Sequence, residues 1–539
     1  MSAPADAALA ARRTAEEVFG HAELLPGQEE AVAALLAGRD VLLIAPTGSG
    51  KSLTYQLAGV LLQGCTVVVS PLLALQQDQV SSLEGAGGAE GRLQAARISS
   101  AESAAHRAEV LDRAAAGDIR FLFLSPEQLA NDEVRDRLAQ VAPRLVAVDE
   151  AHCVSFWGHD FRPDYFRLGD LLLDLGRPTV VAMTATAAPP VRDDIVGRLR
   201  LEDPAVVVTG FERPNLTLDV VRATDADHQR GIVVDLVERT PGQGIVYCRT
   251  RRSAETLAGE LGSRGHRSAV YHAGLSKRRR DEAYAAFMSD DVEVMVATSA
   301  FGMGIDKPDI RYVVHAEVPE SPDTYYQEVG RAGRDGEAAT GTLVYRPEDL
   351  TLGRFFSGGV PRPDDVTAVL DVLVRVDEAD RHAEARERSG VGPRKAARIV
   401  NLVDQVVAES ALDDSGAVTV DDVVERAEAH RRLQRSRVEM MRGYAETTRC
   451  RATYLLGYFG EPPEASCGSC DNCRAGLSDD DGSADSPYAL HAAVSHETFG
   501  AGTVTDVEAD RMTVLFEDVG YRTLSLELVE GECLLRPAD

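Results

Sequence analysis

The chain has 539 residues, of which 44% are hydrophobic, and 57 basic against 86 acidic residues give it a formal charge of −29. At about 150 residues per domain, this length predicts three or four domains. The charge excludes a protein that coats nucleic acid through bulk electrostatics. No stretch approaches the roughly 20 apolar residues that cross a bilayer, and the N-terminus lacks a signal-peptide pattern. We expect a soluble, cytoplasmic protein that does not bind membranes.

Short apolar runs alternate with helical stretches in two successive parts of the chain. This alternation predicts an α/β fold with two parallel-sheet domains side by side and a ligand in the crevice between them. We expect the first domain at 15–209 and the second at 210–350. The expected strands are 41–44, 66–70, 121–124, 145–148 and 179–183 in the first domain, and 244–247, 268–271, 292–297, 312–315 and 341–345 in the second.

The pattern changes after the second domain. Residues 389–402 indicate a turn that leads into a basic amphipathic helix, as in a helix-turn-helix unit, although an ordinary helical spacer fits equally well. The remaining expected segments are an N-terminal tail (1–14), a helical segment (351–432), a cysteine-containing module (433–476), an acidic linker (477–489) and a small β-rich module (490–539).

A glycine-rich loop follows the first expected strand. Residues 45–52 read Ala-Pro-Thr-Gly-Ser-Gly-Lys-Ser, and glycines in a strand-to-helix turn let backbone N–H groups approach phosphates. Lys51 is expected to reach the β- and γ-phosphates of ATP, and Ser52 to bind Mg²⁺. Ala45 stands where the general pattern has a glycine, so a chance turn is the alternative. The predicted nucleotide-binding set in the loop is Thr47, Gly48, Ser49, Gly50, Lys51 and Ser52.

Two acidic residues follow the expected strand 145–148. Asp149 at the end of this strand is suited to hold Mg²⁺, and Glu150 to activate water for attack on the γ-phosphate. Acids that merely cap the next helix are the alternative, but capping does not explain their pairing with Lys51. Together the two motifs predict an ATPase motor.

Phosphoryl transfer also requires positive charge near the transition state. Arg331 and Arg334 stand three residues apart, which predicts that they lie near one face of a helix. If they enter the crevice from the second domain, they would complete the site as arginine fingers.

Four of the cysteines follow the spacing C-x₁₆-C-x₂-C-x₂-C. Two-residue spacings let thiolates converge tetrahedrally on Zn²⁺. An iron–sulfur cluster is also held by four thiolates and is the alternative. The predicted ligands of a structural zinc are Cys450, Cys467, Cys470 and Cys473.

These motifs resemble, in type and order, those of RecQ-type DNA helicases of superfamily 2. The resemblance rests on residues 24–28, 148–165, 184–186, 301–308 and 327–334, and on the cysteine module. It implies RecA-like domains and a motor that moves 3′ to 5′ on single-stranded DNA and unwinds forked or tailed duplexes in repair or recombination. Gln28 would read the adenine of ATP. Leu25 and His21 depart from the family pattern, which puts the strength of adenine recognition in doubt.

The resemblance also implies residues that couple ATP hydrolysis to DNA. Aromatic side chains directly after the hydrolytic acids can stack on unpaired bases, at roughly 1–3 kcal/mol each. A core anchor is the alternative for Trp157. Thr184 and Thr186 are expected to link the ATP and DNA sites. The other predicted coupling residues are Phe156, His159, Phe161 and Arg162.

The C-terminal end departs from the family. A winged-helix domain is expected after the cysteines, yet residues 490–539 resemble the small Tudor-like barrel of UvrD-type helicases. This resemblance implies a protein-docking module, with RNA polymerase as one partner to consider; a module that only stabilises the fold is the alternative. The helical segment 361–430 is expected to replace the winged helix as the duplex contact.

We therefore expect an ATP-dependent, nucleoid-associated DNA helicase that uses ATP, Mg²⁺ and structural Zn²⁺. One rival is an ATPase that acts on RNA, or translocates without unwinding, and is recruited by its C-terminal module. A non-hydrolysing scaffold is the other rival, and the presence of Lys51, Asp149 and Glu150 speaks against it.

Overall fold

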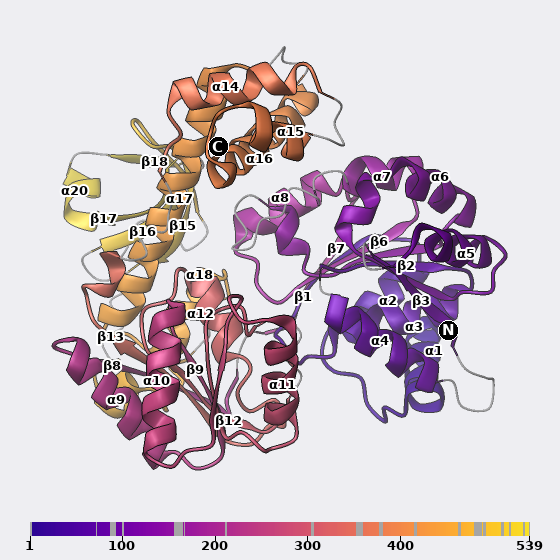
Figure 1. Cartoon of the computed structure of the whole chain (residues 1–539). Helices are drawn as coiled ribbons and strands as arrows, with labels where there is room; N and C mark the ends of the chain where they lie inside the picture. The colour runs from indigo at the N-terminus through magenta and orange to yellow at the C-terminus, as the bar shows by residue number, and fades with distance from the viewer. Residues whose placement is uncertain are drawn as a thin grey trace. The chain divides into compact units, whose positions relative to one another are not determined.

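The computed structural model (Figure 1) places most of the chain in two compact units. The first comprises residues 1–217, 237–314 and 326–341, and the second 218–236, 315–325 and 342–539. Among the described helices, none is long and apolar enough to cross a bilayer. The described residues are 3–71, 73–86, 93–99, 102–155, 165, 168–210, 213–302, 305, 307–351, 359–376, 381–413, 418–461, 465–478, 488, 492–507, 511–516, 519–531 and 534–537.

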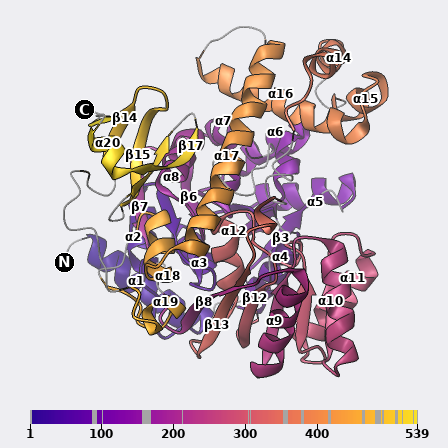
Figure 2. The ribbon, with the colours of Figure 1, turned by 90° about the vertical axis from the view of Figure 1, so that its left-hand side faces the viewer.

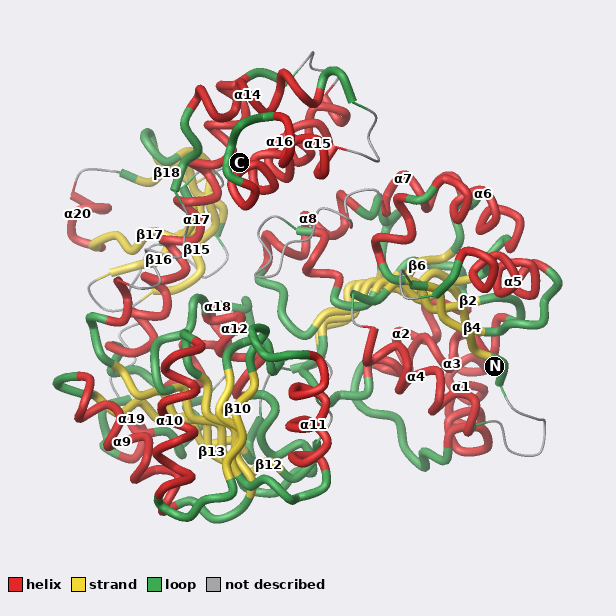
Figure 3. The backbone as a smooth tube through the Cα atoms, viewed as in Figure 1, coloured by secondary structure: helices red, strands yellow, loops and turns green. Residues whose placement is uncertain are grey.

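A seven-stranded parallel sheet forms the centre of the first unit, in the order β3-β4-β2-β5-β6-β1-β7. Helices cover both of its faces (Figure 3), so the central strands are apolar at nearly every position rather than alternating. Its strands are β1 (Val41–Ile44), β2 (Thr66–Val69), β3 (Ala95–Ile98), β4 (Phe121–Leu124), β5 (Leu145–Val148), β6 (Thr179–Thr184) and β7 (Ala205–Val208).

Two of the connecting helices, α5 and α6, begin where a polar side chain caps them. Ser103 accepts a hydrogen bond from the His106 N–H at the start of α5, and Asn131 accepts one from the Glu133 N–H at the start of α6, which satisfies donors that a helix leaves open. The helices are α1 (Ala3–Phe19), α2 (Gln28–Leu36), α3 (Lys51–Leu62), α4 (Leu73–Gly85), α5 (Ala104–Ala115), α6 (Asp132–Val141), α7 (Leu168–Asp174) and α8 (Pro189–Arg198), with 3₁₀ turns η2 (Pro126–Ala130) and η3 (Ala151–Val154).

A second sheet has six strands in the order β10-β11-β9-β12-β13-β8. Gly244 in β9 has no side chain because the ring of Tyr312 lies across it: a Cβ there would come within 2.0 Å of the ring. Together the seven-stranded and six-stranded sheets confirm the two predicted parallel-sheet domains. The strands are β8 (Leu216–Arg222), β9 (Gln243–Tyr247), β10 (Ser268–Tyr271), β11 (Val294–Ala297), β12 (Ile310–His315) and β13 (Ala339–Tyr345), and the helices are α9 (Ala226–Arg239), α10 (Arg251–Ser263), α11 (Lys277–Met288) and α12 (Pro322–Val329).

The predicted helical segment forms a group of helices with a core of its own in the second unit. Val366, Ile399 and Val423 come from three different helices and are fully buried in this core. Residues 389–392 separate α15 from α16, and Gly390 has φ +70° there, a value that favours glycine. The turn-and-helix pattern is confirmed, and its role as a duplex contact stays a prediction. The helices are α14 (Pro363–Leu373), α15 (Arg381–Arg388), α16 (Pro393–Asp413) and α17 (Val420–Glu446).

Helix α17 runs from this group to the cysteine module, and a small sheet lies beside it (Figure 2). The sheet is antiparallel, in the order β17-β16-β15-β14-β18. The predicted β-rich module is therefore present, and its likeness to a Tudor-like barrel stays a prediction. The elements are α18 (Arg451–Tyr458), α19 (Asp471–Arg474), β14 (Ala493–His496), β15 (Gly500–Val507), β16 (Arg511–Phe516), β17 (Gly520–Ser525), α20 (Leu526–Gly531) and β18 (Leu535–Pro537).

The sheet meets α17 and α18 through close contacts. Gly520 abuts Ser436: a Cβ on Gly520 would lie 2.4 Å from the Ser436 hydroxyl. The ring of Tyr521 stacks on Tyr458 with centroids 5.1 Å apart, and the Tyr458 hydroxyl donates to Asp323 at 2.6 Å. The sheet is therefore packed against the cysteine module and is not merely tethered to it.

The helical group should lose stability in acid because of His430 in α17. Burial and the positive charges of Arg437, Arg398 and Arg426 lower the pKa of His430 to about 4, whereas an unfolded histidine has a pKa of about 6.5. Between these two pKa values the unfolded chain binds more protons than the folded chain. The free energy of unfolding therefore decreases as the pH is lowered, by about 2 kcal/mol at pH 5.

Hydrogen exchange of α16 and α17 at pH 7 and pH 5, corrected for intrinsic rates, measures this effect. His430→Gln should remove the pH dependence, and His106→Gln, at an exposed position in α5, should retain it. Equal pH dependence in wild type and His430→Gln would contradict the assignment.

Candidate functional site

The glycine-rich loop connects β1 to α3, as predicted. Gly48 and Gly50 have φ angles of +84° and +66°, which side chains rarely adopt. The Ser49 N–H donates to the Pro46 carbonyl at 3.1 Å and closes the turn. Helix α3 begins directly at Lys51, so the loop leads into a helix N-terminus, where free N–H groups and the helix dipole favour an anion.

Lys51 folds back over this loop. Its ammonium donates to the carbonyls of Ala45 at 2.9 Å and Pro46 at 3.1 Å. Burial lowers the pKa of Lys51, while the carboxylates of Glu150 and Asp149 act in the opposite direction. A half-buried cation whose donors bind neutral carbonyls is well placed to exchange these bonds for bonds to phosphate oxygens.

The Gln28 side chain is buried against the same loop. Its amide nitrogen donates to the Gly50 carbonyl at 2.9 Å and the Ser49 carbonyl at 3.2 Å, and its oxygen accepts from the Leu25 N–H at 2.9 Å. In this arrangement Gln28 holds the loop in place. Adenine recognition by Gln28 stays a prediction and would require an exchange of these bonds.

Ser52 and Asp149 offer the oxygen ligands that Mg²⁺ prefers. Ser52 accepts a hydrogen bond from Gln79 at 3.2 Å, and Asp149 accepts from Ser70 at 3.3 Å and from the Glu150 N–H at 3.0 Å. Burial, then the charge of Glu150, raises the pKa of Asp149 to about 7, and Lys51 opposes this shift. The residues therefore fit a divalent cation, whose charge would keep Asp149 ionised.

A chain of polar contacts leads from the acidic pair to the second domain. Glu150 lies 3.4 Å from Nδ1 of His152, which lies 3.0 Å from the Thr184 hydroxyl. Thr184 donates to the Thr186 carbonyl at 3.0 Å, so its lone pairs accept the Nδ1 proton of His152. Gln327 donates to the Thr186 hydroxyl at 3.3 Å. Thr184 and Thr186 thus lie between the hydrolytic acids and the arginine motif.

Arg331 and Arg334 lie on turns, and the prediction that they share a helix face is wrong. Helix α12 ends at Val329, because the two glycines that follow interrupt it: Gly333 has φ +60° and Gly330 has no side chain to support a helix.

Arg334 lies at the phosphate loop. A Cβ on Gly48 would come within 3.3 Å of its side chain, and its guanidinium donates to the Ile305 carbonyl at 2.6 Å. Its positive charge also contributes to the lowered pKa of Lys51. Arg331 is buried beside Tyr247. Burial raises the pKa of Tyr247, and the positive charge of Arg331 acts in the opposite direction.

Five predicted coupling residues fall outside the described residues. Sequence reasoning also missed four contacts of the site: Ser70, Gln79, His152 and Gln327. His152 and Gln327 stand inside the motifs that were singled out, and Ser70 follows β2 at the edge where Asp149 follows its neighbour β5. Gln79 in α4 carries no sequence signal. The residues outside the described range are Phe156, Trp157, His159, Phe161 and Arg162.

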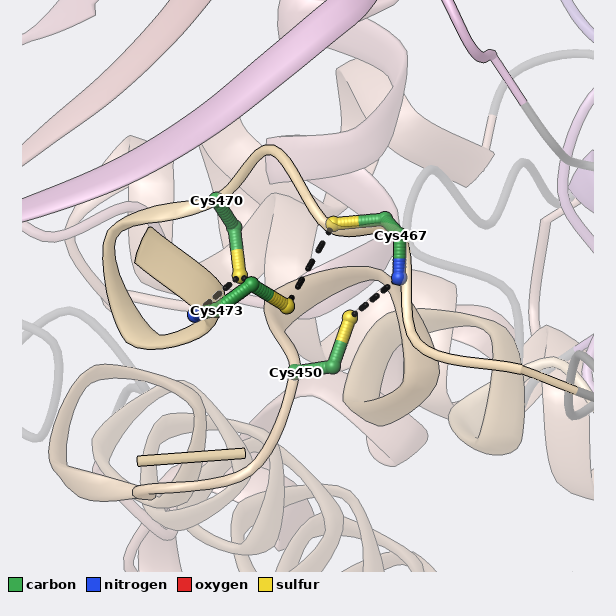
Figure 4. Close-up of side chains that lie close together, drawn as sticks. All are labelled: Cys450, Cys467, Cys470 and Cys473. Carbon is green, nitrogen blue, oxygen red and sulfur yellow. Dashed lines mark hydrogen bonds between the residues drawn. The ribbon is translucent and has the colours of Figure 1, made fainter. Parts of the chain in front are cut away.

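The four predicted zinc ligands converge in the second unit (Figure 4). Their sulfur atoms all lie within 4.8 Å of one another, close to the spacing of about 3.8 Å that tetrahedral Zn–S bonds of about 2.3 Å require. The N–H of Cys467 donates to Cys450 Sγ at 3.2 Å. A hydrogen bond from the Cys470 thiol, and then this bond from Cys467, lower the pKa of Cys450 against the opposing effect of burial. Four sulfur donors at this spacing fit Zn²⁺.

Side chains around the sulfurs hold the cluster together. The Arg451 guanidinium makes two hydrogen bonds of 2.9 Å to the Asp471 carboxylate, so α18 and α19 are joined beside the ligands. Asn472 donates to the carbonyls of Thr447 at 2.9 Å and Arg449 at 2.7 Å. Such outer contacts orient the ligands of a metal site.

Comparison with known proteins identifies each part of this arrangement. Residues 25–195 match the DEAD/DEAH box helicase family, 229–336 the helicase conserved C-terminal domain and 400–474 the RecQ zinc-binding family. The probable ATP-dependent DNA helicase RecS of Bacillus subtilis is 36% identical over 478 residues, which are 87% of this chain and 92% of that protein. The chain belongs to the RecQ family of DNA helicases.

Other relatives agree with this placement in the RecQ family. The ATP-dependent DNA helicase RecQ of Bacillus subtilis is 33% identical over 511 residues, 94% of this chain and 74% of that protein. Among solved structures, the DNA-bound helicase MrfA matches with a TM-score of 0.52 at 19% identity, over 74% of this chain and 57% of that chain. That likeness concerns the fold alone.

Removal of zinc should unfold the cysteine module of this RecQ-family protein. The four cysteines form one cluster, so we expect one Zn²⁺ per chain. Because the metal joins ligands from both sides of α18, chelation should lower the melting temperature. Cys467→Ser should lose the metal, and Cys65→Ser, at a buried position in the first unit, should keep it. Full zinc content in Cys467→Ser, or iron in place of zinc, would contradict this assignment.

Proposed function

We propose that this RecQ-family enzyme couples ATP hydrolysis to 3′-to-5′ movement on single-stranded DNA and to separation of duplexes in repair or recombination. Family membership supports the activity. The observation that carries the coupling is the polar chain from Glu150 through His152 and Thr184 to Thr186 and Gln327. A change in charge at the γ-phosphate can pass along it as a rearrangement of hydrogen bonds.

Each residue of the nucleotide site has a part in this proposal. The N-terminus of α3 and Lys51 bind the phosphates, and Ser52 and Asp149 hold Mg²⁺, which neutralises phosphate charge. Glu150 accepts a proton from the attacking water, and its neighbour His152 orients it. Arg334 stabilises the charge that develops on the γ-phosphate, and Arg331 keeps the arginine turn in place from within the second domain.

The step from ATP to DNA is assigned to the aromatic loop. Phe156, Trp157 and Phe161 follow η3, the turn that carries His152. Stacking of bases on these rings, with Arg162 and His159 beside them, would let the ATP state control the grip on a single strand.

An enzyme that acts on RNA, or translocates without unwinding, is the alternative, and ATPase stimulation by DNA and RNA oligomers separates the two. For the C-terminal sheet we propose a protein partner, in keeping with its resemblance to docking modules. Its bacterial relatives favour a cytoplasmic site of action on nucleoid DNA.

Lys51→Ala and Arg334→Ala should each lower the DNA-stimulated kcat of ATP hydrolysis by about 10³-fold, as expected for the loss of charge stabilisation in phosphoryl transfer. Arg278→Ala, at an exposed position on α11 whose side chain is 86% exposed, is the matched control and should leave kcat unchanged. Steady-state ATPase assays with saturating single-stranded DNA measure the effect. An Arg334→Ala enzyme of normal kcat would remove Arg334 from the proposed mechanism.

Strand displacement on duplexes with a 3′ or a 5′ single-stranded tail tests reaction and polarity together. We expect ATP-dependent unwinding of the 3′-tailed duplex only, and none by Lys51→Ala. Equal unwinding of both substrates would refute the polarity, and ATP turnover without displacement of either would favour a translocase.

A further inference from the structure

A cavity of about 430 Å³ lies where the C-terminal sheet meets the cysteine module. Helices α17 and α18 form one wall, and β16 and β17 form the other. Its volume falls in the range of about 300–1,000 Å³ that is typical of ligand sites. The nucleotide and zinc sites described above do not include its lining residues.

Three arginines from three elements line this cavity: Arg442 of α17, Arg511 of β16 and Arg522 of β17. Two carboxylates of α17 line it as well, and both are held by Arg442: Glu439 at 3.7 Å and Glu446 at 3.1 Å. The three arginines therefore outnumber the two carboxylates of the lining by one positive charge. A net positive cavity contrasts with the charge of −29 on the whole chain.

The sheet wall is built to hold an anion. The Arg522 guanidinium lies 5.8 Å from the centre of the Phe499 ring, which supports it. Burial and then the charge of Arg432 lower the pKa of Arg522, and the carboxylate of Glu439 opposes this shift only in part. A bound anion would relieve both costs. Thr513 and Thr523 face each other across the strands with their hydroxyls 3.1 Å apart. One hydroxyl donates to the other, so the pair offers one further hydrogen-bond donor to a ligand.

The remaining lining residues indicate which anion fits. A free nucleotide needs an apolar slot for its base, yet the two rings at this cavity are packed against other residues: Tyr454 against Tyr444 and Tyr521 against Tyr458. A protein partner would need an apolar or aromatic anchor point. Guanidinium and hydroxyl groups without such a slot are typical of contacts to the phosphates of a nucleic acid.

We infer that this cavity binds the phosphate backbone of a DNA strand, with Arg511 and Arg522 as the charged contacts and the pair of Thr513 and Thr523 as a hydrogen-bond donor. The inference rests on the proposed function, because it supplies a second DNA contact to the same enzyme. The C-terminal sheet then serves as part of the DNA path, in addition to any protein partner.

The test compares the affinity of the full-length chain for a labelled single-stranded oligonucleotide at several salt concentrations. A strand releases about 0.7 counterions per neutralised phosphate, so Arg511→Gln/Arg522→Gln should lower the slope of log K against log salt by about 1.4 and weaken binding several-fold. Arg536→Gln, an exposed arginine of the same sheet outside the cavity, is the matched control and should behave like wild type.

The single Arg511→Gln variant guards against misfolding, because this side chain is exposed; it should lower the slope by about 0.7 with unchanged melting temperature and zinc content. Wild-type slopes in both variants would overturn the inference, as would competition by AMP or inorganic phosphate at nucleotide-equivalent concentrations. Unwinding by the Arg536→Gln control separates the two proposals: if it unwinds while the cavity variants bind like wild type, only the cavity assignment fails.

Discussion

The burial of opposite charges at one edge of the first sheet is the constraint on which the rest depends. Lys51, Asp149 and Glu150 share this site, where burial shifts the pKa of Lys51 and of Asp149 and the charge of Glu150 acts on both pKa values. Burial and the charge of Glu150 raise the pKa of Asp149 to about 7, and a divalent cation at this site would keep Asp149 ionised. In the proposed mechanism the phosphates of the nucleotide would bind Lys51, and the metal ion that accompanies them would bind Asp149. Ligand binding would therefore balance the charges of the site.

The same edge also explains why the site extends beyond its motifs. Parallel strands place their carboxyl ends together, so Ser70 after β2, Asp149 after β5 and Thr184 at the end of β6 become neighbours. The Ser70 hydroxyl donates to Asp149, and the Thr184 hydroxyl contacts His152, which lies beside Glu150. Gln327 then joins the network from α12 through its bond to Thr186, so that polar contacts extend from Glu150 and His152 toward the arginine turn.

Much of the fold could be predicted because apolar runs in buried parallel strands are short and continuous. The bounds of β1, β4, β5 and β10 agree with the sequence expectation. Strand β3 reads Ala-Ala-Arg-Ile and lacks that signal, since it lies at the sheet edge and is only partly buried. The helix expected for Arg331 and Arg334 failed for a local reason, because i, i+3 spacing does not register glycines that end a helix.

Site residues divide in the same way. Lys51 and Cys450 stand in spacings that their chemistry dictates, so the sequence reveals them. Gln79 contributes only because α4 packs beside α3, and no spacing encodes such a contact. A binding role for Arg511 and Arg522 likewise becomes recognisable only in the structure, where β16, β17 and α17 enclose a cavity.

Gly520 has a consequence for how this protein can diversify. Its φ of +72° and its contact with Ser436 leave no space for a side chain. A larger side chain at position 520 would clash with Ser436, separate the sheet from α17 and open one wall of the cavity that Arg511 and Arg522 line. The absence of a side chain at Gly520 is thus what allows the C-terminal sheet to pack against α17.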